Sequence, residues 1–152
     1  MDTYNMIDFN KKKGFICDMD GVIYHGNRVL PGVAEFIQWL HDEDKEYLFL
    51  TNNSGYTPRE LHQKLERLGL DVSEEHFYTS ALATAAFLRD QAPGCSVFAI
   101  GEAGLLNALY DAGITMNDVN PDYVVVGEGR SYSLDTLTKA TNLVFKLSLI
   151  HI

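Results

Sequence analysis

The sequence predicts an α/β fold built around a parallel sheet. Residues 15–17 and 47–50 are short apolar runs without the alternation of a half-solvated strand, which is typical of parallel strands covered by helices on both faces. Amphipathic helical stretches alternate with such runs along the chain, in the order that a parallel α/β sheet requires. Polar residues follow the apolar runs, at the strand ends where open α/β sheets bind ligands.

The composition restricts the class of protein. The chain has 152 residues, enough for one domain or somewhat more, and a formal net charge of −9. This charge argues against a nucleic-acid partner or an anionic membrane surface. No apolar run reaches membrane-spanning length, and residues 1–10 show no basic-then-apolar leader. We therefore expect a cytoplasmic protein in which Cys17 and Cys95 are reduced thiols.

The first apolar run ends in two acids and a glycine. Asp18 and Asp20 are two residues apart, so in an extended chain they project to the same side while Met19 turns away. Two convergent carboxylates form a hard oxygen site suited to Mg²⁺, and Gly21 allows a sharp turn or a close approach to a ligand. The alternative is an ordinary turn after a strand, since Asp and Gly are common in turns.

Residues 18–26, Asp-Met-Asp-Gly-Val-Ile-Tyr-His-Gly, resemble the first motif of the haloacid dehalogenase superfamily of phosphohydrolases. With Pro31 and Gly32 following, the run is similar to the NagD-like branch of that superfamily. The resemblance implies a Rossmann-like parallel core in which Asp18 and the backbone carbonyl of Asp20 hold Mg²⁺. It also implies that Asp18 is the catalytic nucleophile and that Asp20 is the general acid and base.

The segment 24–30 is expected to form a small flap or hairpin, because Gly26 and Asn27 suit a tight turn. In the resembled family this segment folds over the active site, so Tyr24, His25 and Asn27 are candidates for its lining. For His25 the alternative is an ordinary solvated loop histidine. A helix is predicted next, with one apolar stripe at i, i+3, i+4 and i+7 that consists of Val33, Phe36, Ile37 and Leu40.

The second apolar run, 47–50, ends in four small hydrogen-bonding residues. Alone, such a sequence could be a polar turn. After an Asp-x-Asp strand it is similar to the second motif of the same superfamily, in which a hydroxyl and nearby backbone amides hold the phosphoryl oxygens. The resemblance assigns phosphate binding to Thr51, Asn52, Asn53 and Gly21.

A second helix has a clear predicted start. Thr57 is placed to cap it, with Pro58 at the first helical position and Glu60 completing a capping box. The helix is expected to end at Gly69 and to bury a stripe formed by Leu61, Leu65 and Leu68.

Residues 77–80 are expected to form a third strand, with Ser80 capping a helix over residues 81–90. Beyond a break the pattern repeats, because residues 97–102 and 123–128 both read as an apolar strand followed by Gly and Glu. These two segments predict the start of a second, smaller α/β unit.

The second unit resembles the first half of the α/β cap domain that NagD-like proteins insert after the third core strand. We expect residues 1–85 to form the N-terminal half of the core and residues 86–146 the first half of the cap. Residues 127–130 could face a substrate across the gap between the two units, with Arg130 as an anion contact. A homo-oligomer formed through the cap is a further expectation.

The resemblance extends from about residue 14 to residue 146. Later family motifs, a lysine that neutralises the phosphate and further acidic metal ligands, are not in this sequence. Residues 147–152 are expected to be a non-native tail, because they coincide with a translated sequencing adapter. A natural helix end and strand start is the alternative.

The expected activity is Mg²⁺-dependent hydrolysis of a small phosphorylated metabolite, a nucleoside monophosphate or a sugar phosphate, through an aspartyl-phosphate on Asp18. Without the later motifs, the chain by itself is expected to be inactive. Two alternatives stay open. One is a catalytically silent phosphate-binding or interaction module on the same fold, and the other is a phosphotransferase or mutase on the same scaffold.

Overall fold

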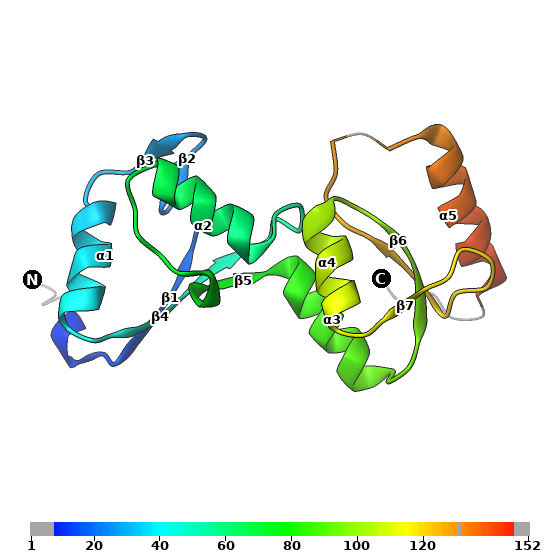
Figure 1. Ribbon diagram of the computed structural model, residues 1–152, viewed down its shortest axis with the longest axis horizontal. Helices are drawn as coiled ribbons and strands as arrows, with labels where there is room; N and C mark the ends of the chain where they lie inside the picture. The colour runs from blue at the N-terminus through cyan, green and yellow to red at the C-terminus, as the bar shows by residue number, and fades with distance from the viewer. Residues whose placement is uncertain (1–7, 131, 148–152) are drawn as a thin grey trace, which may run out of the picture.

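The computed structural model describes residues 8–130 and 132–147, which form two α/β units (Figure 1). The first unit contains a three-stranded sheet in the order β1-β4-β5 and a two-stranded β2-β3 hairpin. The second unit contains a three-stranded sheet in the order β7-β6-β8. Both three-stranded sheets are parallel throughout. The predicted parallel α/β fold is therefore confirmed.

The first sheet consists of β1 (Gly14–Asp18), β4 (Glu46–Thr51) and β5 (Phe77–Thr79). Two helices, α1 (Val33–Asp42) and α2 (Pro58–Arg67), connect these strands. Short 3₁₀ turns, η1 (Phe9–Lys11) and η2 (Glu74–His76), precede β1 and β5. The apolar core of this unit joins side chains of α1 and α2 to one face of the sheet.

The opposite face of the first sheet corrects one expectation, because no helix among the described residues covers it. Phe49, on the covered face, is fully buried, whereas Ile16 is 71% exposed. Leu50 and Tyr78 are exposed on the same side as Ile16. The apolar runs therefore do identify strands with two apolar faces, but α1 and α2 both pack on the same one.

The predicted hairpin is present as β2 (Tyr24–His25) and β3 (Arg28–Val29), which pair in antiparallel fashion. Its turn is made by Gly26 and Asn27, and Gly26 adopts a positive φ of 61° that favours glycine. The hairpin lies beside α2 at the edge of the first unit (Figure 1).

Helix capping agrees with the sequence at α2 but not at α3 (Ser80–Gln91). Thr57 and Glu60 form the predicted capping box at α2. At α3 the predicted cap was wrong, because the hydroxyl of Thr79 accepts from the amide of Leu82. The Ser80 hydroxyl instead donates to the backbone carbonyl of Asn52 at 2.7 Å, which ties the start of α3 to the loop after β4.

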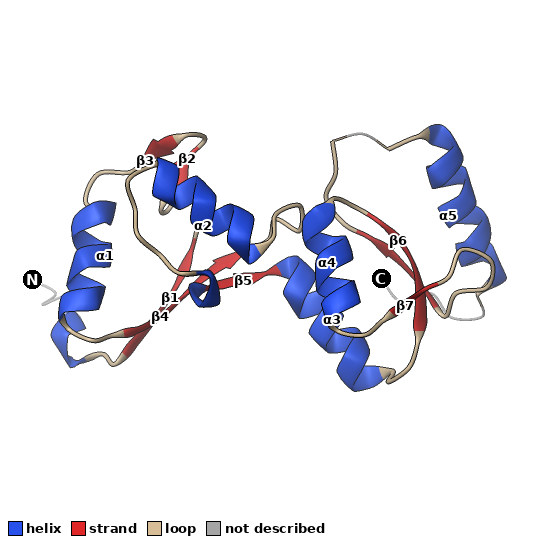
Figure 2. Ribbon diagram, in the orientation of Figure 1, coloured by secondary structure: helices blue, strands red, loops and turns tan. Residues whose placement is uncertain are grey.

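The second unit consists of β6 (Ser96–Ile100), α4 (Ala103–Asp111), β7 (Thr115–Met116), β8 (Tyr123–Val126) and α5 (Leu134–Lys146). The short strand β7 was not predicted, because two residues carry no periodicity. Figure 2 shows α3 leading directly from the last strand of the first sheet toward this unit.

The packing of α3 bears on where the two units divide. Helix α3 buries Ala81, Ala85 and Leu88. These three residues belong to the apolar cluster of the second unit, together with residues of β6 and α4. A division after residue 85 would cut this helix. The domain boundary stays a proposal, and this packing favours placing it before Ser80.

No helix in the described ranges is long and apolar enough to span a membrane. The predicted tail, 147–152, lies outside the described residues except for Leu147, which caps the C-terminus of α5 in an extended conformation.

Candidate functional site

The two predicted acids lie at the carboxyl end of β1. Asp18 is the last residue of that strand, and Asp20 forms an isolated bridge with Tyr24 at the start of the hairpin. Met19, between them, is fully buried, while both aspartates are exposed. One carboxylate oxygen of Asp18 accepts from the Met19 amide at 2.8 Å. The alternation of the strand thus keeps both carboxylates at the surface of the sheet edge.

The second predicted motif meets the first at this edge. The hydroxyl of Thr51, at the end of β4, lies 3.5 Å from a carboxylate oxygen of Asp20. The same hydroxyl accepts from the amide of Asn53 at 3.1 Å. Thr51 is only 5% exposed, so its hydroxyl is held in place by the sheet and by the loop that follows it.

The other predicted phosphate-binding residues differ in their exposure and in the hydrogen bonds that they already make. Asn52 is exposed, and its backbone carbonyl accepts from Ser80. The side-chain carbonyl of Asn53 accepts from the amide of Gly55 at 2.8 Å and closes a local turn. Gly21 has a positive φ of 81°, and its amide donates to the Tyr24 carbonyl at 2.8 Å. Gly21 therefore serves the turn that presents Asp20, and its contact with phosphate stays a prediction.

Tyr24 connects Asp20 to Lys64, a lysine outside the predicted motifs. Burial, then the negative charge of Asp20 and a side-chain interaction with it, raise the pKa of Tyr24. The ammonium group of Lys64 lies 3.7 Å from the centroid of the Tyr24 ring. Burial lowers the pKa of Lys64, and the charge of Asp20 acts against that shift. Three side chains therefore form a continuous contact from the sheet edge to α2.

The loop after β4 is attached to the second unit by two hydrogen bonds. The hydroxyl of Ser54 accepts from the Glu128 amide at 2.7 Å, and the carbonyl of Gly55 accepts from the Gly104 amide at 3.0 Å. A Cβ atom at Gly104 would lie 2.5 Å from the backbone oxygens of Ser54 and Tyr56. Glycine is therefore required for α4 to approach this loop.

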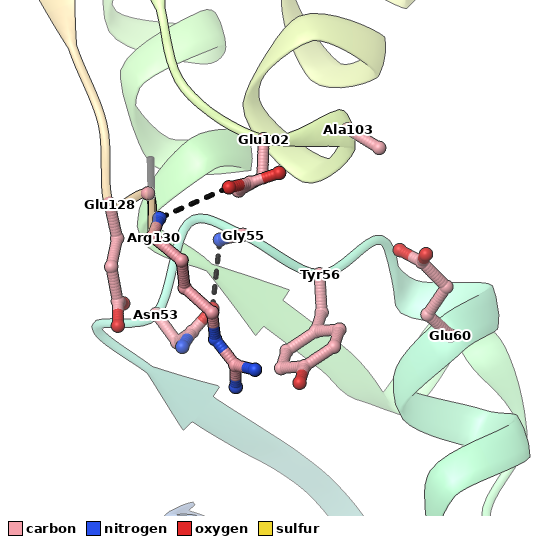
Figure 3. Close-up of a pocket in the computed structure, with 9 residues that line it drawn as sticks. Asn53, Gly55, Tyr56, Glu60, Glu102, Ala103, Glu128 and Arg130 are labelled. Carbon is pink, nitrogen blue, oxygen red and sulfur yellow. Dashed lines mark hydrogen bonds between the residues drawn. The ribbon is translucent and has the colours of Figure 1, made fainter. Parts of the chain in front are cut away.

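A cavity of about 280 Å³ lies where the two units meet. Figure 3 shows the side chain of Arg130 extending from the second unit toward Asn53 and Tyr56. The Arg130 amide donates to a carboxylate oxygen of Glu102 at 3.2 Å. Glu128, Gly129 and Arg130 line this cavity with Asn53, Gly55, Tyr56, Glu60, Glu102 and Ala103. That residues 127–130 face a substrate, with Arg130 as an anion contact, stays a prediction.

A second cavity, of about 690 Å³, opens between the hairpin, α2 and Arg130. It is lined by Gly26, Asn27, Tyr56, Glu60, Gln63, Lys64, Arg67, Leu68 and Arg130. Asn27 was a predicted lining residue, whereas the polar residues of α2 were missed. Glu60, Lys64 and Arg67 share one helix face by their i, i+4, i+7 spacing, but a polar helix face is ordinarily solvated, so this spacing does not mark a site. The residues that the helix buries, Leu61 and Leu65, lie on the other face.

The oxygen donors at the sheet edge fit Mg²⁺ in their chemistry. Asp18 and Asp20 offer hard carboxylate oxygens, and proteins often hold this ion with one or two carboxylates while substrate phosphate and water complete the octahedron. Within the part of the chain that the structure describes, no group of three or more His, Cys, Asp or Glu side chains could hold a metal. The two aspartates are thus the donors that the described residues supply.

Comparison with known proteins identifies the family. The family model described as haloacid dehalogenase-like hydrolase matches residues 15–115. The ribonucleotide monophosphatase NagD of Escherichia coli (strain K12) is 46% identical over 132 residues, which are 87% of this chain and 52% of the relative. The dihydroxyacetone phosphatase of Corynebacterium glutamicum (strain R) is 44% identical over 130 residues, which are 86% of this chain and 47% of the relative.

The fold agrees with the same assignment. The solved structure of NagD from E. coli K-12 superposes with a TM-score of 0.83 at 44% identity, covering 90% of this chain and 54% of that one. The chain spans about half the length of the curated relatives it matches. The matched region contains both the Asp18–Asp20 segment and the loop after β4. The resemblance stated from the motifs is confirmed, and the chain belongs to the haloacid dehalogenase-like hydrolase family, in its NagD-like branch.

Proposed function

We propose that this chain carries the nucleophilic half of a phosphohydrolase site for small phosphomonoesters. The observation that supports it most is the meeting of the two motifs. The Thr51 hydroxyl lies 3.5 Å from the Asp20 carboxylate, although the two residues are separated by a helix and a hairpin in the sequence. A nucleophile, a general acid and a phosphate-holding hydroxyl are the parts that phosphoryl transfer through an enzyme-bound intermediate requires.

In the proposed mechanism, a carboxylate oxygen of Asp18 attacks phosphorus and the bond from phosphorus to the ester oxygen breaks. The product is an aspartyl-phosphate, which divides one difficult displacement into two easier steps. Asp18 is exposed at the end of β1, so it is open to a substrate. The hydrogen bond from the Met19 amide to one of its oxygens fixes the carboxyl plane.

Asp20 donates a proton to the leaving oxygen and then takes one from the water that hydrolyses the intermediate. Its contacts with Thr51 and Tyr24 hold it next to Asp18. Thr51 and the loop amides after it orient the phosphoryl oxygens, together with Asn52 and Asn53. Mg²⁺ held by the Asp18 carboxylate and the backbone carbonyl of Asp20 would supply charge neutralisation between the Asp18 carboxylate and the phosphate.

The proposed substrates are small phosphorylated metabolites. Two relatives are named as a ribonucleotide monophosphatase and a dihydroxyacetone phosphatase, which is consistent with nucleoside monophosphates or sugar phosphates. The smaller cavity is lined by Asn53 of the proposed phosphate-binding loop, and both cavities have lining residues from both units. The leaving group of the substrate would occupy this space.

A second candidate function, for the chain alone, is a catalytically silent phosphate-binding module. It is favoured by the metal donors, because the described residues supply two carboxylates and no larger acidic cluster. In that case the chain would bind a phosphomonoester without releasing phosphate.

Phosphate release separates the two candidates. We would assay p-nitrophenyl phosphate with Mg²⁺ on this chain and on a chimera that continues it with the C-terminal half of E. coli NagD. Release by the chimera that is lost in Asp18→Asn supports the phosphohydrolase. Release by neither protein, with phosphate binding retained, supports the silent module.

A further inference from the structure

We propose that the larger cavity binds a second anionic group of the substrate, a carboxylate or another phosphate. The preferred substrates would then be phosphomonoesters that carry an additional negative charge. This inference rests on the proposed function, because it extends the same site from the reacting phosphate to the rest of the substrate.

Three cations face this cavity from two elements. Lys64 and Arg67 lie on the polar face of α2, and Arg130 reaches the cavity from the loop after β8. The chain has 12 lysines and arginines against 21 acids. Three cations and one carboxylate around one cavity are therefore the reverse of the overall charge balance. A single carboxylate, that of Glu60, lines the same space.

These cations form no ion pair among the described residues, although the charge of Asp20 acts on Lys64. In the described ranges, the ion pairs join Lys11 to Asp8, Arg89 to Asp90 and Lys139 to Asp118. None of them involves Lys64, Arg67 or Arg130.

Glu60 is engaged elsewhere, because its carboxylate accepts from the amide and the hydroxyl of Thr57 in the capping box. With three cations against one carboxylate, the lining carries a surplus of positive charge. Such a surplus favours an anion more strongly in a partly enclosed site than on an open surface.

The position of Lys64 links this charge to the proposed reaction site. Its ammonium group lies 3.7 Å from the centroid of Tyr24 and 5.7 Å from that of Tyr56. Tyr24 in turn forms a backbone bridge with Asp20. Tyr24 is only 2% exposed and does not line the cavity, so Lys64 itself is the group that a substrate extending from Asp18 into the cavity would contact.

The remaining lining suits an anion that is bound through directed hydrogen bonds. Arginine offers donors in a planar fork that matches the two oxygens of a carboxylate or phosphate, and Arg67 and Arg130 both supply such a fork. Asn27 and Gln63 add side-chain amides on the hairpin and on α2. A neutral sugar would leave the three charges without a partner.

The test compares ligand pairs that differ in one anionic group. We would measure binding by isothermal titration calorimetry, at fixed Mg²⁺ and ionic strength, for phosphoglycerate against glycerol phosphate. A second pair, fructose bisphosphate against fructose monophosphate, tests whether a phosphate replaces the carboxylate. The proteins are the wild-type chain, Lys64→Met, Arg67→Gln and Arg130→Gln, each checked for its fold by circular dichroism.

The matched control is Arg59→Gln. Arg59 is exposed on the same helix and does not line the cavity, so its removal changes the net charge by the same amount. We expect the wild-type chain to bind the more charged member of at least one pair about tenfold more tightly, as charge-assisted hydrogen bonds provide. Each cavity variant should reduce that ratio by at least about threefold, and Arg59→Gln should preserve it.

Equal binding of both members of each pair by the wild-type chain would overturn the inference. A ratio that all three cavity variants preserve, or that Arg59→Gln reduces equally, would also overturn it. The proposed function fails separately, when the chimera releases no phosphate. Selective binding without release would keep the anion site and refute the phosphohydrolase, whereas release without selectivity would do the reverse.

Discussion

The hydroxyl of Ser54 accepts a 2.7 Å hydrogen bond from the backbone amide of Glu128, 74 residues further along the chain. Ser54 is 6% exposed and follows directly on the loop that contains Thr51 and Asn53. This bond therefore fixes the proposed phosphate-binding loop against the second unit. The position of Arg130, two residues after Glu128, depends on the same contact.

Replacing Ser54 with alanine should destabilise the protein. The Glu128 amide would lose its partner in a partly buried setting, which costs about 1 kcal/mol of unfolding free energy. Urea denaturation followed by circular dichroism measures this cost. Thr141→Ala is a suitable control, since the Thr141 hydroxyl bonds within its own helix to the Leu137 carbonyl and is exposed. An equal loss of unfolding free energy in both variants would show that the bond between the units stabilises the protein no more than a bond within one helix.

Gly104→Ala should destabilise the chain although alanine is the better helix former. At this position within α4, propensity alone would favour alanine by about 1 kcal/mol. The added Cβ would lie 2.5 Å from the Ser54 and Tyr56 carbonyl oxygens, which are backbone atoms and cannot rotate away. We expect a net loss of about 2 kcal/mol in unfolding free energy.

The control for that substitution is Asn107→Ala, on an exposed position of the same helix. It should leave stability unchanged or raise it slightly, because alanine has the higher helix propensity. Both variants can be compared by urea denaturation. A stable Gly104→Ala protein would mean that α4 does not need its close approach to the loop after β4.

Tyr24 should make stability fall at alkaline pH. Burial and Asp20 raise its pKa in the folded state, whereas in the unfolded chain it ionises near the ordinary value of 10.0. Above that pH the unfolded state loses the proton and the folded state keeps it. Unfolding then releases a proton, so stability decreases as pH rises, by up to about 1.4 kcal/mol per pH unit. Tyr24→Phe should therefore lose less stability than wild type between about pH 10 and about pH 11.

Chemical denaturation at several pH values measures this difference. Tyr110→Phe provides the matched control, because Tyr110 is 79% exposed and should leave the alkaline loss as it is in wild type. Tyr47 has a pKa raised by burial as well, and it contributes equally to all three proteins. Parallel pH curves for wild type and Tyr24→Phe would refute the assigned role of Tyr24.

Local sequence signals predicted most elements of this fold. Thr57, Pro58 and Glu60 form a complete start signal, and α2 begins where they place it. Two adjacent hydroxyl residues were harder to distinguish at α3, where Thr79 caps the helix. The Ser80 hydroxyl bonds across the fold to Asn52, and no local pattern reports such a contact.

Local sequence signals likewise predict some residues of the candidate site and not others. Asp18, Asp20 and Thr51 could be selected because each directly follows or ends an apolar strand, and parallel strand ends meet at one edge. Lys64 and Arg67 could not be selected, because a polar helix face is ordinarily solvated. Only the packing of α2 beside the hairpin, with Lys64 over Tyr24, shows which face lines a cavity.

The central claim is that Asp18 receives the phosphoryl group. The most direct test is mass spectrometry of the chimera after acid quenching, with Asp20→Asn used to slow hydrolysis of the intermediate. The account predicts a phosphoryl adduct on the peptide that contains Asp18 and none in Asp18→Asn. Phosphate release by Asp18→Asn at the wild-type rate, or an adduct on another residue, would contradict it.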